Sequence, residues 1–277
     1  MQYENRPEPE GINTSPNNPY LEFVWLLVTV GVAVVALVAI LSLSAGWLAQ
    51  QLPFAKEKQL ATSLGITQLI DKGDPAIQQW LQQLANGLAP AEQLPAGMTI
   101  TVHYVQSPEI NAYATLGGNI VIFSGLLEKL HTENAVALVL AHEMAHIRQR
   151  DPLMALGRGT VIAVVLSLFA GGDAGMAQTF VGNLGLLTAL SFTRQQERAA
   201  DQIAVATLLA HYGTLNGAME LFEQLPQSSH LPELLRSHPL TEKRLAYLRD
   251  MAATHASGKP IPFSLAAIRS TATPLSP

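Results

Sequence analysis

The chain has 277 residues, of which 48% are apolar and only 13% are charged, and it contains no cysteine. Soluble proteins carry about a quarter charged residues, so this composition indicates membrane-embedded sequence. The lack of cysteine excludes disulfides, thiolate zinc ligands and cysteine nucleophiles. The net charge of -5 and the absence of a long basic run give no reason to expect a nucleic-acid partner.

The N-terminal region is expected to hold a polar tail and one membrane span. Residues 1–20 are rich in Pro, Asn and Glu and are predicted to form a disordered tail. Residues 23–55 contain no charged residue, and we predict a transmembrane anchor at 21–50, because about 20 apolar residues cross a bilayer core. Trp25 and Trp47 would lie about 33 Å apart along this helix, near the two membrane interfaces. The alternative is a cleaved signal peptide, whose apolar core is normally about 7–15 residues long and follows basic residues.

After the span, the pattern changes from helical to strand-like and back. Residues 51–96 are predicted to be a helical spacer or a packing layer. Residues 98–105 alternate and are rich in β-branched side chains, which indicates a strand. Two short apolar runs flank Gly117-Gly118 and predict a hairpin or a sharply bent strand pair. Further helices are predicted at 123–131, 132–150, 194–212, 214–225 and 241–254, with Gly213 as a helix C-cap.

Residues 159–192 form a second apolar region, divided by Asp173 into two runs that are each short for a membrane span. Length alone favours a buried or amphipathic pair of helices. The alternative is a hairpin that enters the lipid or covers the active-site cleft.

The strongest chemical signal is His142-Glu143-Met144-Ala145-His146, within a segment that is predicted to be helical. Histidines four positions apart share one face of a helix, so both imidazoles can bind one ion, with Glu143 beside the open side of the metal. The surrounding sequence is too apolar for two solvated histidines. The motif therefore predicts a catalytic zinc site with Glu143 as its base.

A catalytic zinc ion needs a third protein ligand, and the best candidate is Glu197 in the helical segment 194–212. Asp201 lies one turn later on the same face and could accept a hydrogen bond from a ligating imidazole. The alternative is that both acidic residues make surface contacts with Arg194 or Arg198. The residues alone leave these two interpretations open.

These motifs, taken in order, resemble the gluzincin metallopeptidases that include the bacterial heat-shock membrane protease and the CAAX prenyl endopeptidase. The resemblance covers about residues 98–250. It rests on Asn111-Ala112-Tyr113-Ala114 with Gly117-Gly118, on His142–His146, on Glu197–Asp201, and on Ser237-His238-Pro239 followed by Arg244.

The resemblance implies an α+β, mostly helical, zincin-like domain with a small β-sheet. It implies one Zn²⁺ per chain, held by His142, His146 and Glu197, with Glu143 as general base. It further implies that His238 acts in catalysis, with Asp201 and Arg244 supporting the site. Residues at the upstream match are predicted to bind substrate: Asn111, Ala112, Tyr113, Gly117 and Gly118. Multi-spanning members have several membrane helices, so this chain resembles the single-anchor branch, and prenyl-peptide specificity does not carry over.

The sequence therefore predicts a single-pass, membrane-anchored zinc endopeptidase whose partners are the lipid bilayer and polypeptide substrates, which we expect to be unfolded or membrane-associated proteins. We place the peptidase domain at 97–254 and a loose tail at 255–277, and expect the segment 115–123 to pair with substrate. A bacterial inner membrane is the expected location, with the side of the catalytic domain and the oligomeric state left open. The alternative function is a catalytically silent membrane adaptor or chaperone with the same fold.

Overall fold

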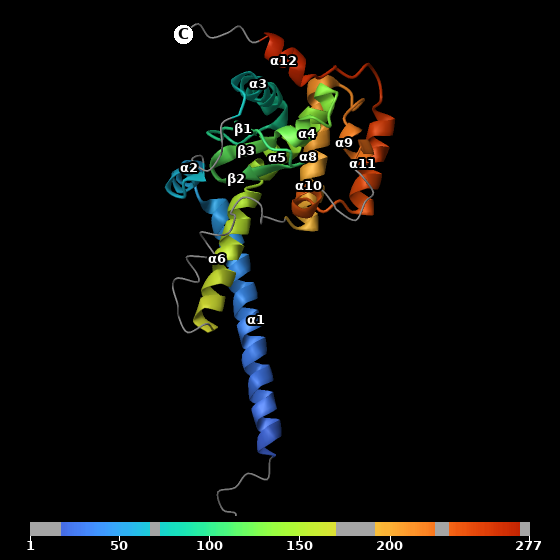
Figure 1. Cartoon of the computed structure of the whole chain (residues 1–277). Helices are drawn as coiled ribbons and strands as arrows, with labels where there is room; N and C mark the ends of the chain where they lie inside the picture. Colours follow the sequence, from blue (N-terminus) through green and yellow to red (C-terminus); the bar gives the residue numbers. More distant parts are fainter. Residues whose placement is uncertain (1–17, 67–72, 170–191, 225–232, 272–277) are drawn as a thin grey trace, which may run out of the picture.

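The structure, a computed structural model, describes residues 18–66, 73–169, 192–224 and 233–271 and is mostly helical, with one small sheet (Figure 1). The α+β fold class is confirmed. The elements are α1 (Pro19–Gln51), α2 (Phe54–Ser63), α3 (Pro75–Glu92), β1 (Thr101–Val105), β2 (Ala112–Thr115), the 3₁₀ turn η2 (Leu116–Gly118), β3 (Asn119–Phe123), α4 (Ser124–Leu127), α5 (Glu133–Arg148), α6 (Asp151–Phe169), α8 (Arg194–Tyr212), α9 (Glu220–Gln224), α10 (Glu233–Ser237), α11 (Glu242–Thr254) and α12 (Leu265–Thr271).

The sheet has the strand order β1-β3-β2, with β1 parallel and β2 antiparallel to β3. The predicted strand pair is present, and its turn uses Gly117 and Gly118 at φ values of 75° and 81°. A Cβ atom at Gly118 would lie 2.0 Å from the carbonyl oxygen of Thr99, so only glycine fits there. The expectation that 115–123 pairs with substrate is wrong, because β3 is already bonded along both edges.

Helix α3 closes the outer edge of β1 with glutamine side chains. Gln78 accepts from the backbone N–H of Tyr104 at 2.7 Å and donates to the carbonyl of Val102. Gln82, one turn later, accepts from the backbone N–H of Val102 at 2.9 Å and donates to the carbonyl of Ile100 at 3.1 Å. These bonds satisfy an exposed strand edge, so α3 is part of the domain core, the packing-layer alternative for this region.

The two central helices, α5 and α8, begin and end as the sequence predicts. Thr132 caps α5 by accepting from the backbone N–H of Ala135, and Thr193 forms a reciprocal capping box with Gln196 at the start of α8. The predicted C-cap Gly213 ends α8 in the left-handed region, at φ 69°. Helix α5 is buried along almost its whole length, so it is the core helix against which the sheet and α8 pack.

The apolar helix α1 extends away from the domain, and α6 runs beside its domain-proximal part (Figure 1). Helix α1 is the one helix among the described residues that is long and apolar enough to cross a membrane. Most of its large apolar side chains are exposed, including Trp25 and Trp47. The predicted tail lies in residues 1–17, outside the described residues, as do residues 170–191 of the second apolar region.

The segment after α11 packs more closely than the predicted loose tail. Phe263 is buried and contacts Trp80 of α3, with ring centroids 4.9 Å apart. The backbone N–H of Glu133 donates to the carbonyl of Ile261 at 2.8 Å. Arg269 of α12 donates to Asp74 at 2.9 Å. Residues 261–271 therefore close over the start of α5 and over α3.

Candidate metal centre and active site

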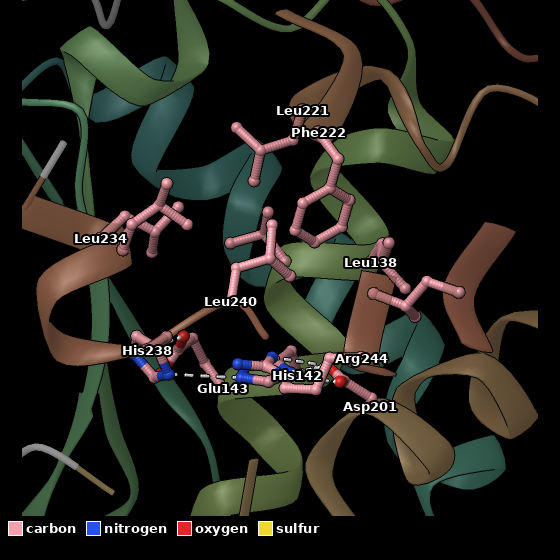
Figure 2. A pocket seen from close by; sticks show the side chains of 13 residues that line it. Leu138, His142, Glu143, Asp201, Leu221, Phe222, Leu234, His238, Leu240 and Arg244 are labelled. Carbon is pink, nitrogen blue, oxygen red and sulfur yellow. Dashed lines mark hydrogen bonds and ion pairs between the residues drawn. The ribbon is translucent and has the colours of Figure 1, made fainter. Parts of the chain in front are cut away.

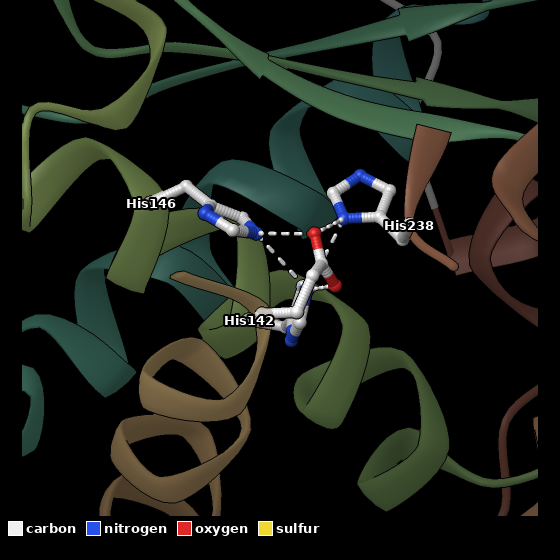
Figure 3. Close-up of side chains that lie close together, drawn as sticks. His142, His146 and His238 are labelled. Atoms are coloured by element: carbon white, nitrogen blue, oxygen red, sulfur yellow. Dashed lines mark hydrogen bonds and ion pairs between the residues drawn. The ribbon is translucent and has the colours of Figure 1, made fainter. Parts of the chain in front are cut away.

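Two helices bring the predicted zinc ligands together inside the domain (Figure 3). His142 and His146 lie on one face of α5, with their Nε2 atoms 3.1 Å apart. Glu197 reaches them from the first turn of α8, and its carboxylate oxygens lie 3.5 Å from His142 Nε2 and 3.6 Å from His146 Nε2. Glu197 is only 1% exposed, which excludes the alternative of surface contacts with Arg194 or Arg198.

Asp201 and Arg244 hold one side of this centre. Asp201 Oδ1 lies 3.2 Å from His142 Nδ1. This contact holds the His142 ring in the orientation in which its other nitrogen, Nε2, faces His146 and Glu197. Arg244 makes a two-pronged contact with Asp201, at 2.6 Å and 2.8 Å. Its Nη1 also lies 2.6 Å from Glu197 Oε2. One buried guanidinium thus orients both the ligand carboxylate and the acceptor of His142.

Asp151 supports His146 in the same way, and the sequence analysis did not identify it. His146 Nδ1 lies 2.8 Å from Asp151 Oδ2, and Gln196 donates to Asp151 Oδ1 at 2.5 Å. Phe192 stacks on the His146 ring at a centroid distance of 4.0 Å. The signal available in the sequence was an acidic residue five positions after His146, at the end of a helix.

Glu143 and His238 complete the centre. Both carboxylate oxygens of Glu143 are buried without a hydrogen-bond partner among the described residues. Its Oε1 lies 3.4 Å from His238 Nε2. The other nitrogen of His238 lies 3.0 Å from Glu197 Oε1 and 3.3 Å from His142 Nε2. His238 therefore lies between Glu143 and the candidate ligands, and its side chain is buried.

The charges of the centre are strongly coupled. Burial lowers the pKa of His142, but hydrogen bonds to Asp201 and Glu197 raise it to about 10. Burial, with the neighbouring His142 and His238, holds the pKa of His146 well below its usual value. Burial opposes ionisation of Glu197, yet hydrogen bonds from the imidazoles of His142 and His238 lower its pKa. These contacts therefore favour an ionised Glu197 and a protonated His142, and zinc bound here would release a proton from His142, because a ligating imidazole is neutral.

The donor atoms fit a zinc ion. Nitrogen and oxygen ligands about 2.0–2.1 Å from a tetrahedral zinc lie roughly 3.3 Å from one another. The two imidazole Nε2 atoms are 3.1 Å apart, His142 Nε2 lies 3.5 Å from Glu197 Oε2, and His146 Nε2 lies 3.6 Å from the other oxygen, Oε1. Together with His238, these residues form a group whose ligand atoms all lie within 4.8 Å of one another. The unpartnered carboxylate of Glu143 beside the group fits a base whose partner is a water molecule.

An apolar pocket opens beside Glu143 (Figure 2). Leucine side chains, together with Phe222, make most of its wall, and Glu143 and His238 lie at one end. The lining residues are Leu138, Val139, His142, Glu143, Asp201, Leu221, Phe222, Leu234, Leu235, His238, Leu240, Arg244 and Leu248.

The five predicted substrate-binding residues divide into two groups. Asn111, Ala112 and Tyr113 lie at the start of β2 and in the residue before it, on a strand that contacts α5. Gly117 and Gly118 lie in the turn between β2 and β3, where they are buried against α2 and Thr99. This burial contradicts the predicted substrate contact of the two glycines, whose role is to allow the turn.

Comparison with known sequences supports this reading of the centre. Residues 75–252 match the sequence profile of peptidase family M48. The matched region starts at α3 and includes every proposed ligand, so it agrees with the observed packing of α3 into the core.

Several curated proteases are similar to the chain. The beta-barrel assembly-enhancing protease of Escherichia coli K12 is 31% identical over 198 residues, which is 65% of this chain and 39% of that protein. The metalloprotease LoiP of the same organism is 29% identical over 162 residues, 56% of this chain and 63% of LoiP. The mitochondrial metalloendopeptidase OMA1 of Schizosaccharomyces pombe is 29% identical over 155 residues, 54% of this chain and 45% of OMA1. The chain spans about 40% of the length of the first of these relatives.

Proposed function

The chain belongs to peptidase family M48, and we propose that it is a membrane-anchored zinc metalloendopeptidase that cleaves unfolded or membrane-associated polypeptides. The observation that carries the catalytic part is the juxtaposition of His142, His146 and Glu197 with the buried carboxylate of Glu143, which has no hydrogen-bond partner among the described residues. A pure binding protein has no use for such a base beside a metal site.

Each residue of the centre has a definite task in this proposal. His142, His146 and Glu197 hold zinc, which when bound polarises the scissile carbonyl and lowers the pKa of a coordinated water. Glu143 accepts the proton of the attacking water and passes it to the leaving amine. His238 lies between Glu143 and Glu197 and donates a hydrogen bond to the carbonyl oxygen of the substrate, on which negative charge develops.

Substrate binding is proposed along β2 and in the apolar pocket. β3 is paired on both edges, and glutamine side chains of α3 bond the outer edge of β1. Among the described strands this leaves the outer edge of β2, which no other strand occupies, as the edge proposed for substrate. Backbone pairing along β2 would select an extended chain with little regard to its sequence. The pocket beside Glu143 would take an apolar side chain near the scissile bond, and such side chains are exposed in unfolded proteins.

We propose that α1 is retained as the anchor rather than cleaved. Its 33 residues extend about 50 Å, more than a bilayer core requires. The hydroxyls of Thr29 and Ser44 each donate to the carbonyl four residues earlier, at 2.7 Å, so they need no water within the bilayer. Helix α6 lies beside α1, and this position favours entry of the apolar end of α6 into the same lipid layer. Entry into the lipid is one of the alternatives considered for residues 159–192.

The proposal is tested on the full-length protein in detergent. We expect about one zinc per chain by atomic emission and cleavage of unfolded casein that stops when a chelator removes the metal. The rival function, a silent adaptor, predicts binding of casein without cleavage by the zinc-loaded protein. Release of the protein from membranes by alkaline carbonate, with a shortened N-terminus, would instead identify α1 as a cleaved signal sequence.

A further inference from the structure

A buried acidic residue links the helix after the anchor to the back of the metal centre. Glu57 lies on α2, which is separated from α1 by only Leu52 and Pro53. The Glu57 side chain is almost fully buried, at 2% residue exposure. Its Oε1 accepts from the backbone N–H of Gly117 at 2.8 Å, in the turn that joins β2 to β3. One oxygen of this carboxylate therefore holds the turn of the strand pair.

The other oxygen binds Arg150, the residue between the metal helix α5 and α6. Arg150 Nε donates to Glu57 Oε2 at 2.7 Å, and Nη2 lies 2.6 Å from the same oxygen. The guanidinium also lies over the ring of Phe54, 5.9 Å from its centroid. Two residues of α2, three positions apart, thus hold one arginine. A buried charge needs such partners, since an unpaired one is strongly unfavourable.

Arg150 has an unusual backbone. Its φ is +64°, one of two positive values at non-glycine residues in the described chain. A residue with a Cβ atom is unfavourable in this left-handed region and stays there when its surroundings hold it. The left-handed residue sets the direction in which the next residue, Asp151, leaves α5. Asp151 turns back to His146 Nδ1 and also accepts from Gln196, beside the ligand Glu197.

We propose that Glu57 and Arg150 are positioning residues for the metal centre: their ion pair holds the left-handed turn that directs Asp151 at His146. These contacts connect α2, the helix that directly follows the membrane anchor α1, to the zinc ligand His146. Helix α2 therefore helps to set the affinity of the site for zinc. This inference rests on the zinc peptidase function proposed above. It predicts that the identity of residue 150 matters through its backbone conformation as well as its charge.

The test measures zinc affinity by competition with a chromophoric chelator, in detergent, at constant pH. Glu57→Gln keeps an acceptor for Gly117 but removes the charge that holds Arg150, and we expect zinc affinity to fall about 10-fold, the lower end for residues that orient ligands. Two double variants then remove the whole charge pair, so neither leaves an unpaired charge. Glu57→Gln with Arg150→Gly should bind zinc about 10-fold more tightly than Glu57→Gln with Arg150→Ala, because glycine adopts the left-handed turn unaided.

Asp74→Asn is the matched control. Asp74 likewise accepts a backbone N–H with one oxygen, from Ala76 at 2.9 Å, and binds an arginine with the other, Arg269 Nε at 2.9 Å. It contacts neither the proposed ligands nor Asp151, so the zinc affinity of this variant should equal that of the wild type. Equal affinities of the glycine and alanine double variants would overturn the inference, as would wild-type affinity in Glu57→Gln. Neither result would touch the peptidase function, which fails only if the wild type itself binds no zinc or cleaves nothing.

Discussion

Glu92, the last residue of α3, should make the protein less stable as pH rises. Its side chain is fully buried, and its one hydrogen bond among the described residues comes from the Thr207 hydroxyl, at 2.6 Å. Burial raises the pKa of Glu92 to about 7, although the Thr207 hydrogen bond and the charge of Arg148 oppose the change. The unfolded chain ionises at the usual value, 4.5.

The free energy of unfolding changes with pH because Glu92 holds its proton to a higher pH in the folded state than in the unfolded state. Below pH 4.5 the carboxyl is protonated in both states and has no effect on the free energy of unfolding. Between that value and about 7 the unfolded state ionises first, so the free energy of unfolding falls as pH rises. A difference of about 2.5 pKa units corresponds to roughly 3 kcal/mol, of which about 2–3 kcal/mol is lost between pH 5 and pH 8.

The assay is urea unfolding of full-length wild type and Glu92→Gln in detergent, followed by circular dichroism at several pH values. The glutamine keeps an acceptor for Thr207 and cannot ionise. All other titrating groups are common to both proteins, so the difference between the two free energies isolates Glu92. We expect the free energy of unfolding of the variant, relative to that of the wild type, to rise by about 2–3 kcal/mol between pH 5 and pH 8. A difference that stays constant with pH would refute the reasoning.

Three further variants test the metal centre. Glu197→Ala should lose zinc, because two histidines leave the coordination incomplete; stoichiometric zinc by atomic emission would show that the third ligand is another residue. Asp151→Asn should keep the fold but bind zinc about 10–100-fold more weakly in chelator competition. Unchanged affinity would show that the contact of Asp151 with His146 does not contribute to zinc binding. His238→Ala should retain zinc and lower kcat by about 10²–10³-fold with a smaller change in KM. Loss of zinc from that variant would make His238 a ligand.

Local patterns in the sequence predicted the parts of the fold that local forces determine. The spacing of His142 and His146 placed both rings on one helix face, and Gly213 marked the end of α8. The strand pair around Gly117 was also predicted. Each of these features depends on residues only a few positions apart, so propensity and periodicity carry the information.

Contacts between distant segments could not be predicted in the same way. The parallel pairing of β1 with β3 makes β3 the central strand, and no local pattern reveals a crossover of this kind. The sequence does not reveal that the glutamines of α3 bond the edge of β1, because the paired residues are 20 and 26 positions apart and their contact depends on the tertiary fold. The contact between Glu57 and Arg150 joins residues 93 positions apart, and nothing in either neighbourhood indicates the other.

The central claim is that Glu143 is the base of a zinc peptidase, and one measurement tests it most directly. Glu143→Gln keeps the shape of the side chain but cannot accept a proton, and the residue is not a proposed ligand. The full-length variant should bind one zinc and unfold like the wild type, while its rate of casein cleavage falls by about 10²–10⁴-fold or more. Cleavage at the wild-type rate by the folded, zinc-loaded variant would contradict the account.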